Sequence, residues 1–390
     1  MAILLVTVFV YQSDAMDDCS KISQYCSCDK LMNLIWCYNF TDLSQLDFSS
    51  GFKINGLELF PLNRLVLNDR LNLRGIESNG DLQFNFGNLA SIDFRANPFK
   101  GFKRSDSLTL NIFKSNLKFT YDGKDVDDDD VCDMLLKDPS QEWAMPVFDV
   151  LLLLNNNPIT KPVCPVMFRN ANISRFNMAH NGRVGQLMFK NTTSVDINSR
   201  VTSLTIANQY QHLNKEFLNG IVFKRLVHLT IRSTELTNIA DDAFDDLGGL
   251  QSINLAPDNI EAFIKSSDNK WMSNLNKKIT IDPANVTNLN STFISENQFA
   301  IILDVSFVKY LFPDEDFCRF RFFPHNHLVN PVVYIFPDVS NLCTCTLAFI
   351  YRYNKNFNDG KYVLPSFFQL CEKNFTQFMD SCNFEQRLYN

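Results

Sequence analysis

The sequence of 390 residues is poor in the residue types that build most catalytic and metal sites. It has 5 histidines, 13 glycines and 3 tryptophans. It contains no G-x-S-x-G nucleophile elbow, no H-E-x-x-H zinc motif, no phosphate loop and no dinucleotide fingerprint. His325 and His327 form an H-x-H pair, but Pro324 favours a surface turn there, and no further ligand lies at suitable spacing. We therefore expect no catalytic residues, no metal and no cofactor.

Concentrated positive charge is also missing. The chain has 36 Lys and Arg against 43 Asp and Glu, with a net charge of −7. Without a basic stripe, nucleic acid is not an expected partner. Six acidic residues lie between Asp122 and Asp130, but a calcium loop needs alternating carboxylates, a turn glycine and a bidentate Glu. Gly123 is misplaced for that role and no Glu follows, so we interpret this segment as a solvated loop on the rim of the fold.

Long apolar runs are absent after the N-terminus. A membrane helix needs ~18 to 20 apolar residues, and the best candidate, from Phe299, is short and carries Asp304 and Lys309. The first residues, "MAILLVTVFVYQSDA", combine an apolar run with small residues at Ser13 and Ala15, which is typical of a secretory signal. No Lys or Arg precedes the run, and a buried first strand is the alternative. We predict a signal peptide over residues 1–15 and a secreted chain without a membrane anchor.

Cysteines, in contrast, are plentiful and clustered. Of the 11 cysteines, the two end groups are Cys19, Cys26, Cys28 and Cys37, and Cys343, Cys345, Cys371 and Cys382. Such clusters suit disulfides in an oxidising compartment. The Asn-X-Ser/Thr sequons predict N-glycosylation at Asn39, Asn172, Asn191, Asn285, Asn290 and Asn374. We therefore expect an extracellular glycoprotein.

The segment from Leu226 to Phe263 repeats its own pattern. The apolar and turn positions Leu226, Leu229, Ile231, Thr234, Leu236 and Ile239 recur at one constant spacing as Leu250, Ile253, Leu255, Asp258, Ile260 and Phe263. This spacing of about 24 residues lies within the range of roughly 20 to 29 residues that is typical of a solenoid. The same arrangement of apolar residues precedes the turn positions Asn97, Asn157, Asn181 and Gln209, although Asp149 and Arg183 interrupt it.

Each repeat therefore predicts a short strand with alternate residues buried. In this phase Leu152 and Leu154 point inward, whereas Leu151 and Leu153 point outward. Phe168, Phe217 and Phe244 fall in the return halves, where they would stack between coils and account for part of the 36 phenylalanines. We expect a continuous parallel sheet from about Ile92 to Leu255 and few helices.

The pattern LxxLxLxxN from Leu89 to Phe263 resembles the leucine-rich repeat family. The end cysteines, spaced C-x6-C-x-C-x8-C and C-x-C-x25-C-x10-C, resemble the caps of its extracellular members. Membership would imply a curved strand-rich α/β-type solenoid, a horseshoe with the parallel sheet on its concave face. It would also imply the pairs Cys19–Cys28, Cys26–Cys37, Cys343–Cys371 and Cys345–Cys382. The overall plan resembles, in addition, secreted arthropod proteins similar to the non-catalytic leucine-rich subunit of Oplophorus luciferin monooxygenase.

This resemblance divides the chain into four parts. They are a signal peptide (1–15), an N-terminal cap (16–55), repeats (56–312), and a C-terminal cap and tail (313–390). The repeats contain an irregular insertion at about 100–147, where there is also room for one irregular repeat around "SLTLNIF". Cys132 and Cys164 flank the insertion and are expected to form a disulfide that attaches it to the solenoid. Cys318 is then left without an assigned partner. Zinc is the alternative for the clusters, but C-x-C spacing and an oxidising compartment favour disulfides.

An exposed sheet is a natural binding surface, so we predict a non-catalytic binding protein. The outward positions of the repeats contain three arginines, many small polar residues and no aromatic residue. The candidate ligand-binding residues are Arg95, Arg175, Asn177, His228, Thr230, Arg232 and Asn254. The expected partner is a protein, with a glycan as a second class. Alternative functions are a non-catalytic subunit of a secreted enzyme complex, a structural matrix component, and the ectodomain of a truncated receptor or adhesion protein.

Overall fold

The computed structural model describes most of the chain between residues 21 and 383. The described residues are 21–29, 31–67, 70–93, 107–113, 115, 118–138, 140, 148–154, 162–179, 188–190, 195–207, 211–233, 235–266, 271, 299–305, 310–316, 329–335, 344–346, 348 and 375–383. No described helix is long and apolar enough to cross a membrane.

Strands dominate the described residues. They are β1 (Cys26–Asp29), β2 (Leu34–Tyr38), β3 (Phe52–Phe60), β4 (Leu65–Leu67), β5 (Ile76–Gly87), β6 (Leu89–Asp93), β7 (Leu108–Phe113), β8 (Phe119–Tyr121), β9 (Lys124–Asp125), β10 (Val150–Leu154), β11 (Arg175–Ala179), β12 (Ser203–Ala207), β13 (His212–Leu213), β14 (His228–Ser233), β15 (Asn238–Ile239), β16 (Ser252–Pro257), β17 (Phe299–Val305) and β18 (Val329–Ile335). The helices are short: α1 (Asp129–Lys137), α2 (Gly220–Phe223), α3 (Ile260–Ser266) and α8 (Phe375–Ser381), with 3₁₀ turns at Leu43–Gln45 and Pro165–Phe168.

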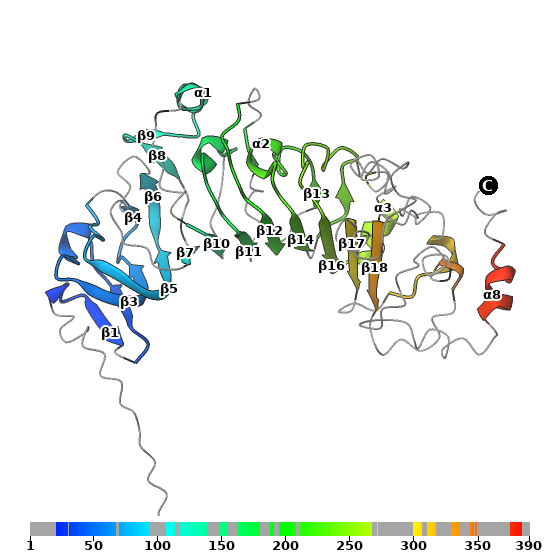
Figure 1. The fold of residues 1–390 in the computed structure, drawn as a ribbon, viewed down its shortest axis with the longest axis horizontal. Coiled ribbons are helices and arrows are strands. Elements are labelled where there is room, and N and C mark those ends of the chain that lie inside the picture. The colour runs from blue at the N-terminus through cyan, green and yellow to red at the C-terminus, as the bar shows by residue number, and fades with distance from the viewer. Residues whose placement is uncertain are drawn as a thin grey trace, which may run out of the picture.

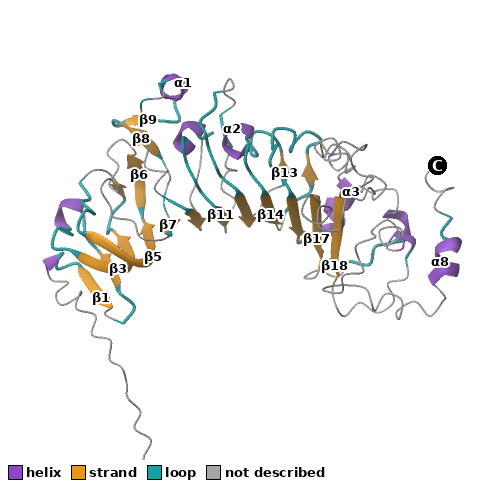
Figure 2. Cartoon of the chain, in the orientation of Figure 1, coloured by secondary structure: helices purple, strands orange, loops and turns teal. Residues whose placement is uncertain are grey.

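The main element is a 12-stranded sheet in the order β1-β2-β3-β5-β7-β10-β11-β12-β14-β16-β17-β18. All its strand pairs are parallel except β1 with β2. Figure 1 shows these strands side by side along an arc, and Figure 2 shows them grouped on one edge, with α1 and α2 on the opposite edge. The chain is therefore a β-solenoid in which each coil adds one strand to the sheet.

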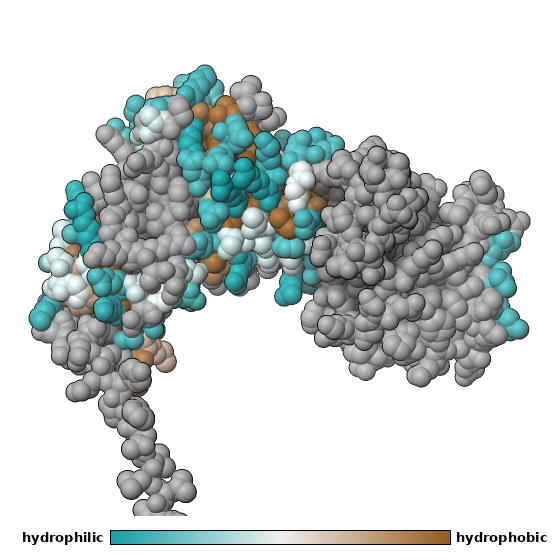
Figure 3. Space-filling model, in the orientation of Figure 1, coloured by the Kyte–Doolittle hydropathy of each residue, from teal (hydrophilic) through white to brown (hydrophobic). Residues whose placement is uncertain are grey.

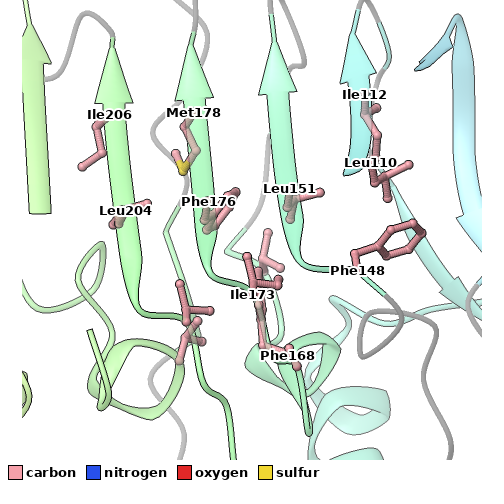
Figure 4. Packing of buried hydrophobic residues seen from close by; sticks show 14 of the residues in the cluster. Leu110, Ile112, Phe148, Leu151, Phe168, Ile173, Phe176, Met178, Leu204 and Ile206 are labelled. Carbon is pink, nitrogen blue, oxygen red and sulfur yellow. The ribbon is translucent and has the colours of Figure 1, made fainter. Parts of the chain in front are cut away.

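The inward residues of the sheet form continuous apolar rows. One row, set by the parallel register, contains Leu57, Phe84, Leu110, Leu151, Phe176, Leu204, Leu229 and Ile253. Every side chain in it is at most 2% exposed. Figure 4 shows Leu110, Leu151, Phe176 and Leu204 pointing to the same side of the sheet. Burial of such a strip is the main stabilising contribution in a solenoid, because each coil covers the apolar edge of its neighbour.

Phenylalanines from the return segments close this core. Phe168 lies 5.7 Å from Phe176 and 5.8 Å from Phe189, measured between ring centroids, and Phe189 lies 5.7 Å from Phe223. Offset and edge-to-face rings at these distances add to the gain from burial. Phe217 and Phe244 are also buried, as their place in the repeat predicts. Large aromatic residues thus fill the space between the sheet and the opposite edge.

The predicted phase of the β10 repeat is wrong by one residue. Leu151 is 2% exposed and pairs with Leu110 and Phe176, so it points inward and Leu152 points outward. Phe148, with no exposed surface, occupies the first apolar position that Asp149 had been expected to break. In this phase the turn residue is Asn156 in place of Asn157, and both lie outside the described residues. Four consecutive leucines made the two phases indistinguishable in the sequence.

The predicted extent of the sheet is also wrong. The long sheet runs from Cys26 to Ile335, well beyond Ile92 to Leu255. It includes β7, which lies where one irregular repeat was expected beside the insertion. The repeat assigned to Leu89 is not part of it. Instead β6 belongs to a separate sheet, ordered β4-β6-β8-β9, in which Ser91 is 7% exposed. Ser91 and Asp93 are outward positions of this repeat in the predicted phase, and they are thus not on the face of the long sheet.

The acidic segment has more structure than the expected loop. Asp122 and Gly123 form the tip of the β8–β9 hairpin, and α1 begins at Asp129. Asp127 is 9% exposed, and its Oδ1 accepts a hydrogen bond of 2.8 Å from the backbone N–H of Cys164. A disulfide joins Cys132 to Cys164. The segment is therefore attached to the solenoid by a covalent bond and a buried carboxylate.

Buried Arg169 completes this attachment. Its guanidinium donates to the backbone carbonyls of Leu135, Leu136 and Asp138 at the C-terminal end of α1. The last carbonyls of a helix generally lack donors from the helix itself, and a cation there also interacts favourably with the helix dipole. Burial lowers the pKa of Arg169, and the negative charge of Asp138 opposes that shift in part. The role of Arg169 is structural.

Disulfides are present at both ends of the solenoid. Cys26 and Cys37 join the antiparallel pair β1–β2, and Cys345 is bonded to Cys382, as the cap resemblance implies. Cys28 is also disulfide-bonded. Its expected partner Cys19, the expected pair Cys343–Cys371, and Cys318 lie outside the described residues.

Candidate binding face

The exposed side of the long sheet, here called the sheet face, is formed by the outward residues of its strands. The parallel register aligns them in three rows. The first row contains Leu34, Gly56, Gln83, Thr109, Val150, Arg175, Ser203, His228 and Ser252. The middle row contains Trp36, Glu58, Asn85, Asn111, Leu152, Asn177, Thr205, Thr230 and Asn254. The last row contains Tyr38, Phe60, Gly87 and Phe113 and, further along, Ala207, Arg232 and Ala256.

Aromatic residues are concentrated at the N-terminal end of the sheet face. We call Trp36, Tyr38, Glu58, Phe60 and Phe113 the aromatic–acid patch. The rings of Tyr38 and Phe60 are stacked, with centroids 4.9 Å apart and an interplanar angle of 6°. The ring of Phe113 follows at 5.1 Å from Phe60. The expectation that the sheet face carries no aromatic residue is therefore wrong, because the outward positions were assigned only from the regular repeats, which do not include β2, β3 and β7.

A glycine makes the contact between Phe60 and Phe113 possible. Gly87 lies between them in the last row, on β5. A Cβ atom at Gly87 would lie 2.9 Å from two ring carbons of Phe60 and 3.3 Å from one of Phe113. The two rings therefore close over the glycine from either side. Covering a strand glycine with a neighbouring aromatic ring offsets the side-chain packing that the glycine itself cannot supply.

Glu58 connects the aromatic rings to a row of polar side chains. Its Oε2 accepts a hydrogen bond of 3.3 Å from the hydroxyl of Tyr38, and its Oε1 accepts one of 3.2 Å from Nδ2 of Asn85. Asn85 Oδ1 accepts in turn from Asn111 Nδ2. Burial, together with the negative charge of Glu58 and its hydrogen bond, raises the pKa of Tyr38 above its usual value of 10.0.

From β11 to β16 the sheet face carries three basic side chains, and most of the other described side chains there are small. We call Arg175, His228 and Arg232 the basic patch. All three are exposed, and His228 lies two strands from Arg175, which is about 10 Å at the usual strand spacing. Small neighbours flank them on the adjacent strands: Ser203 and Ser252 beside His228, and Ala207 and Ala256 beside Arg232. His228 Nδ1 lies 2.8 Å from the hydroxyl oxygen of Ser252.

The other three predicted site residues that can be located lie in the middle row, between the rows that contain the basic patch. Asn177, Thr230 and Asn254 belong to the middle row, where Thr205 separates Asn177 from Thr230. The Oδ1 atoms of Asn177 and Asn254 are buried and accept no hydrogen bond from the protein. The structure thus brings six of the seven predicted residues onto one face. Arg95 lies outside the described residues.

Of the six predicted glycosylation sites, two can be located. Asn39, directly after β2, and Asn172, before β11, are both exposed. Asn191, Asn285, Asn290 and Asn374 lie outside the described residues. The exposure of Asn39 and Asn172 is what modification would require, and glycosylation itself remains a prediction.

The opposite edge of the solenoid is hydrophilic. Figure 3, which views one flank of the solenoid, shows hydrophilic side chains near this edge with hydrophobic ones between them. A cavity of about 480 Å³ beside α2 is lined by both signs of charge, including Lys215, Lys224 and Asp196. Lys224 and Asp196 lie 3.5 Å apart, and Lys215 lies 3.4 Å from Asp242. Within the described residues no group of three His, Cys, Asp or Glu side chains could hold a metal ion. His325 and His327 lie outside them.

Comparison of the chain with protein-family models, with curated proteins and with solved structures found no match.

Proposed function

We propose that this protein is a secreted, non-catalytic binding protein that contacts a protein partner through its sheet face. The observation that carries the proposal is the presence of aromatic and arginine side chains on one exposed, continuous sheet. Tyr, Trp and Arg are enriched at the energetically dominant positions of protein interfaces. Trp36 and Tyr38 supply the aromatic part of such a surface, and Arg175 and Arg232 supply the charged part.

The shape of the solenoid supports this proposal. The long sheet offers an extended surface whose residues are held on strands, so their positions change little when a partner binds. The paired charges on the opposite edge already satisfy one another. A partner would therefore gain more by covering the sheet face than by covering that edge.

We further propose that the fold is a leucine-rich repeat horseshoe with cysteine-rich caps. The regular repeat that places β14 beside β16, the arc in Figure 1 and the disulfides at both ends support this assignment. The same disulfides and the exposed sequons at Asn39 and Asn172 support an extracellular location.

Affinity capture from the native extracellular fluid tests the binding function. One variant combines Phe60→Ala and Phe113→Ala, and a second combines Arg175→Glu and Arg232→Glu. The matched control carries Arg200→Glu and Arg225→Glu, two exposed arginines outside the three rows. We expect at least one sheet-face variant to lose about tenfold or more of the captured partner, while the control retains it. Equal capture by all four proteins would contradict the proposal.

A further inference from the structure

We propose that the aromatic–acid patch is the anchor site for an arginine side chain of the protein partner. This inference rests on the proposed function, because it assigns one contact within the binding face. It concerns the N-terminal end of the sheet and is independent of the residues Arg175, His228 and Arg232.

Charge complementarity identifies the occupant. The first four parallel strands of the sheet, β2, β3, β5 and β7, present twelve outward positions in the three rows. Among these twelve, Glu58 is the one residue with a formal charge. It lies beside the stacked rings of Tyr38 and Phe60 and is partly buried. A negative charge surrounded by apolar and neutral polar groups is partly desolvated, so a cation gains more there than on an open surface.

The carboxylate has hydrogen-bonding capacity left for a ligand. A carboxylate offers about four lone-pair sites, and the structure shows one donor on each oxygen of Glu58. Tyr38 and Asn85 fix its orientation before a partner arrives. An incoming guanidinium can therefore donate to a carboxylate that is already positioned, with little loss of side-chain freedom.

The aromatic rings favour arginine over other occupants. The guanidinium is flat, weakly hydrated and able to pack against aromatic rings, whereas a lysine ammonium is compact and strongly hydrated. A neutral sugar would leave the charge of Glu58 without a counter-charge, whereas a guanidinium neutralises it. Leu34 and Trp36 continue the apolar surface along β2, where the methylene groups of the arginine stem would pack.

Ligand-detected saturation-transfer NMR on the full chain tests this assignment. The probe is the peptide Ac-Gly-Arg-Gly-amide, and the comparison probe is the same peptide with citrulline, which is isosteric and uncharged. We expect the arginine peptide to bind with an affinity on the order of millimolar and the citrulline peptide at least about tenfold more weakly. Glu58→Gln should weaken arginine binding by about tenfold. Glu261→Gln, which removes an exposed carboxylate outside the rows, should not.

Several results would overturn the inference. Equal binding of both peptides, or of the arginine peptide to the Glu58→Gln variant, would show that no charge is recognised. Binding of a chitin trisaccharide that Phe60→Ala abolishes would indicate a glycan site instead. Self-association in sedimentation that Glu58→Gln abolishes would indicate that a second copy of this chain occupies the patch.

The capture experiment separates the two proposals. If Glu58→Gln retains the native partner while Phe60→Ala with Phe113→Ala loses it, the arginine assignment is wrong and the binding function stands. If no change on the sheet face affects capture, both are wrong.

Discussion

The two ends of the sheet face share one core and present different chemistry. Within the three rows, the outward residues from β2 to β7 are aromatic rings, apolar and neutral polar residues and Glu58, and those from β11 to β16 are arginines, a histidine, asparagines and small residues. Beneath both, the inward row is uniformly apolar and buried. The fold fixes the inward positions alone, and this leaves the outward positions free to differ from coil to coil.

This contrast explains why the proposed contacts divide into an anchor and a charged region. At the N-terminal end Tyr38, Phe60 and Phe113 already contact one another, so their conformational freedom is lost on folding and not on binding. At the C-terminal end Arg175 and Arg232 are exposed, with small residues beside them. Exposed charges contribute more to the rate of association and to specificity than to affinity.

Truncation of a core side chain should lower the free energy of unfolding by a similar amount at either end. This is the largest effect that we predict. Phe84→Ala, under the aromatic–acid patch, should lower the free energy of unfolding by about 3 to 5 kcal/mol, and Leu204→Ala, near the basic patch, by about 2 to 5 kcal/mol. Urea denaturation followed by circular dichroism measures both. A loss below about 1 kcal/mol at either site would mean that the core is not continuous.

Removal of the Cys26–Cys37 disulfide should destabilise the N-terminal end of the sheet and leave the stability of β14 and β16 unchanged. The bond closes a loop with a sequence separation of 11, for which chain entropy predicts a loss of about 3 kcal/mol. In the double variant Cys26→Ala and Cys37→Ala, amide hydrogen exchange should accelerate in β1 and β2 and stay unchanged in β14 and β16. Equal acceleration in all four strands would show that the ends unfold as one unit.

Gly87→Ala should destabilise the packing of the aromatic–acid patch at the N-terminal end. The added methyl group would push against Phe60 and Phe113, which costs about 1 to 2 kcal/mol because the rings can shift in part. Gly248→Ala is the matched control, since its Cβ would meet no atom within 4 Å. Thermal unfolding should distinguish the two variants. If both have the wild-type midpoint, the rings do not pack over Gly87 in solution.

The smallest expected effect is on the titration of Tyr38. Because burial and Glu58 raise its pKa, the folded state holds the phenolic proton more tightly than the unfolded state. The resulting stabilisation is complete below the usual pKa of 10.0 and disappears as the pH rises through the raised pKa. Glu58→Gln should lower the pKa of Tyr38 toward 10.0 without reaching it, since burial remains. NMR of tyrosine labelled at Cζ, assigned with Tyr38→Phe, measures the shift, and an unchanged pKa would show that Glu58 does not contact the phenol.

The prediction of the core from the sequence succeeded where inward and outward residues differ in polarity. Leu229 and Ile231 alternate with His228, Thr230 and Arg232, and the structure has that phase. In "VLLLL" from Val150 both faces are apolar, so nothing in the local sequence separates Leu151 from Leu152. The Leu89 strand followed the expected spacing and yet joined the second sheet, because spacing predicts a strand but not its neighbours.

The sequence predicted only part of the candidate site, because outward positions can be assigned only where the repeat is regular. Arg175, His228 and Arg232 lie in regular repeats, so their outward positions followed from the period. Trp36, Tyr38 and Phe60 lie in the N-terminal region where the repeat pattern decays, and they were missed. A signal was available in "LIWCYN": Ile35 and Cys37 alternate with Trp36 and Tyr38, which is the pattern of a strand with an aromatic outward side.

The sequence by itself determined that the chain folds as a repeating, strand-rich solenoid, because a regularly recurring hydrophobic pattern of this length can be buried only by stacking coils. It also indicated which cysteines could close the ends. Only the tertiary structure decided which residues meet on the sheet face. The register places Tyr38, Phe60, Gly87 and Phe113 in one row, although three coils of the chain separate the first from the last. Outward side chains are not required for burial, so no hydrophobic pattern in the sequence records their neighbours.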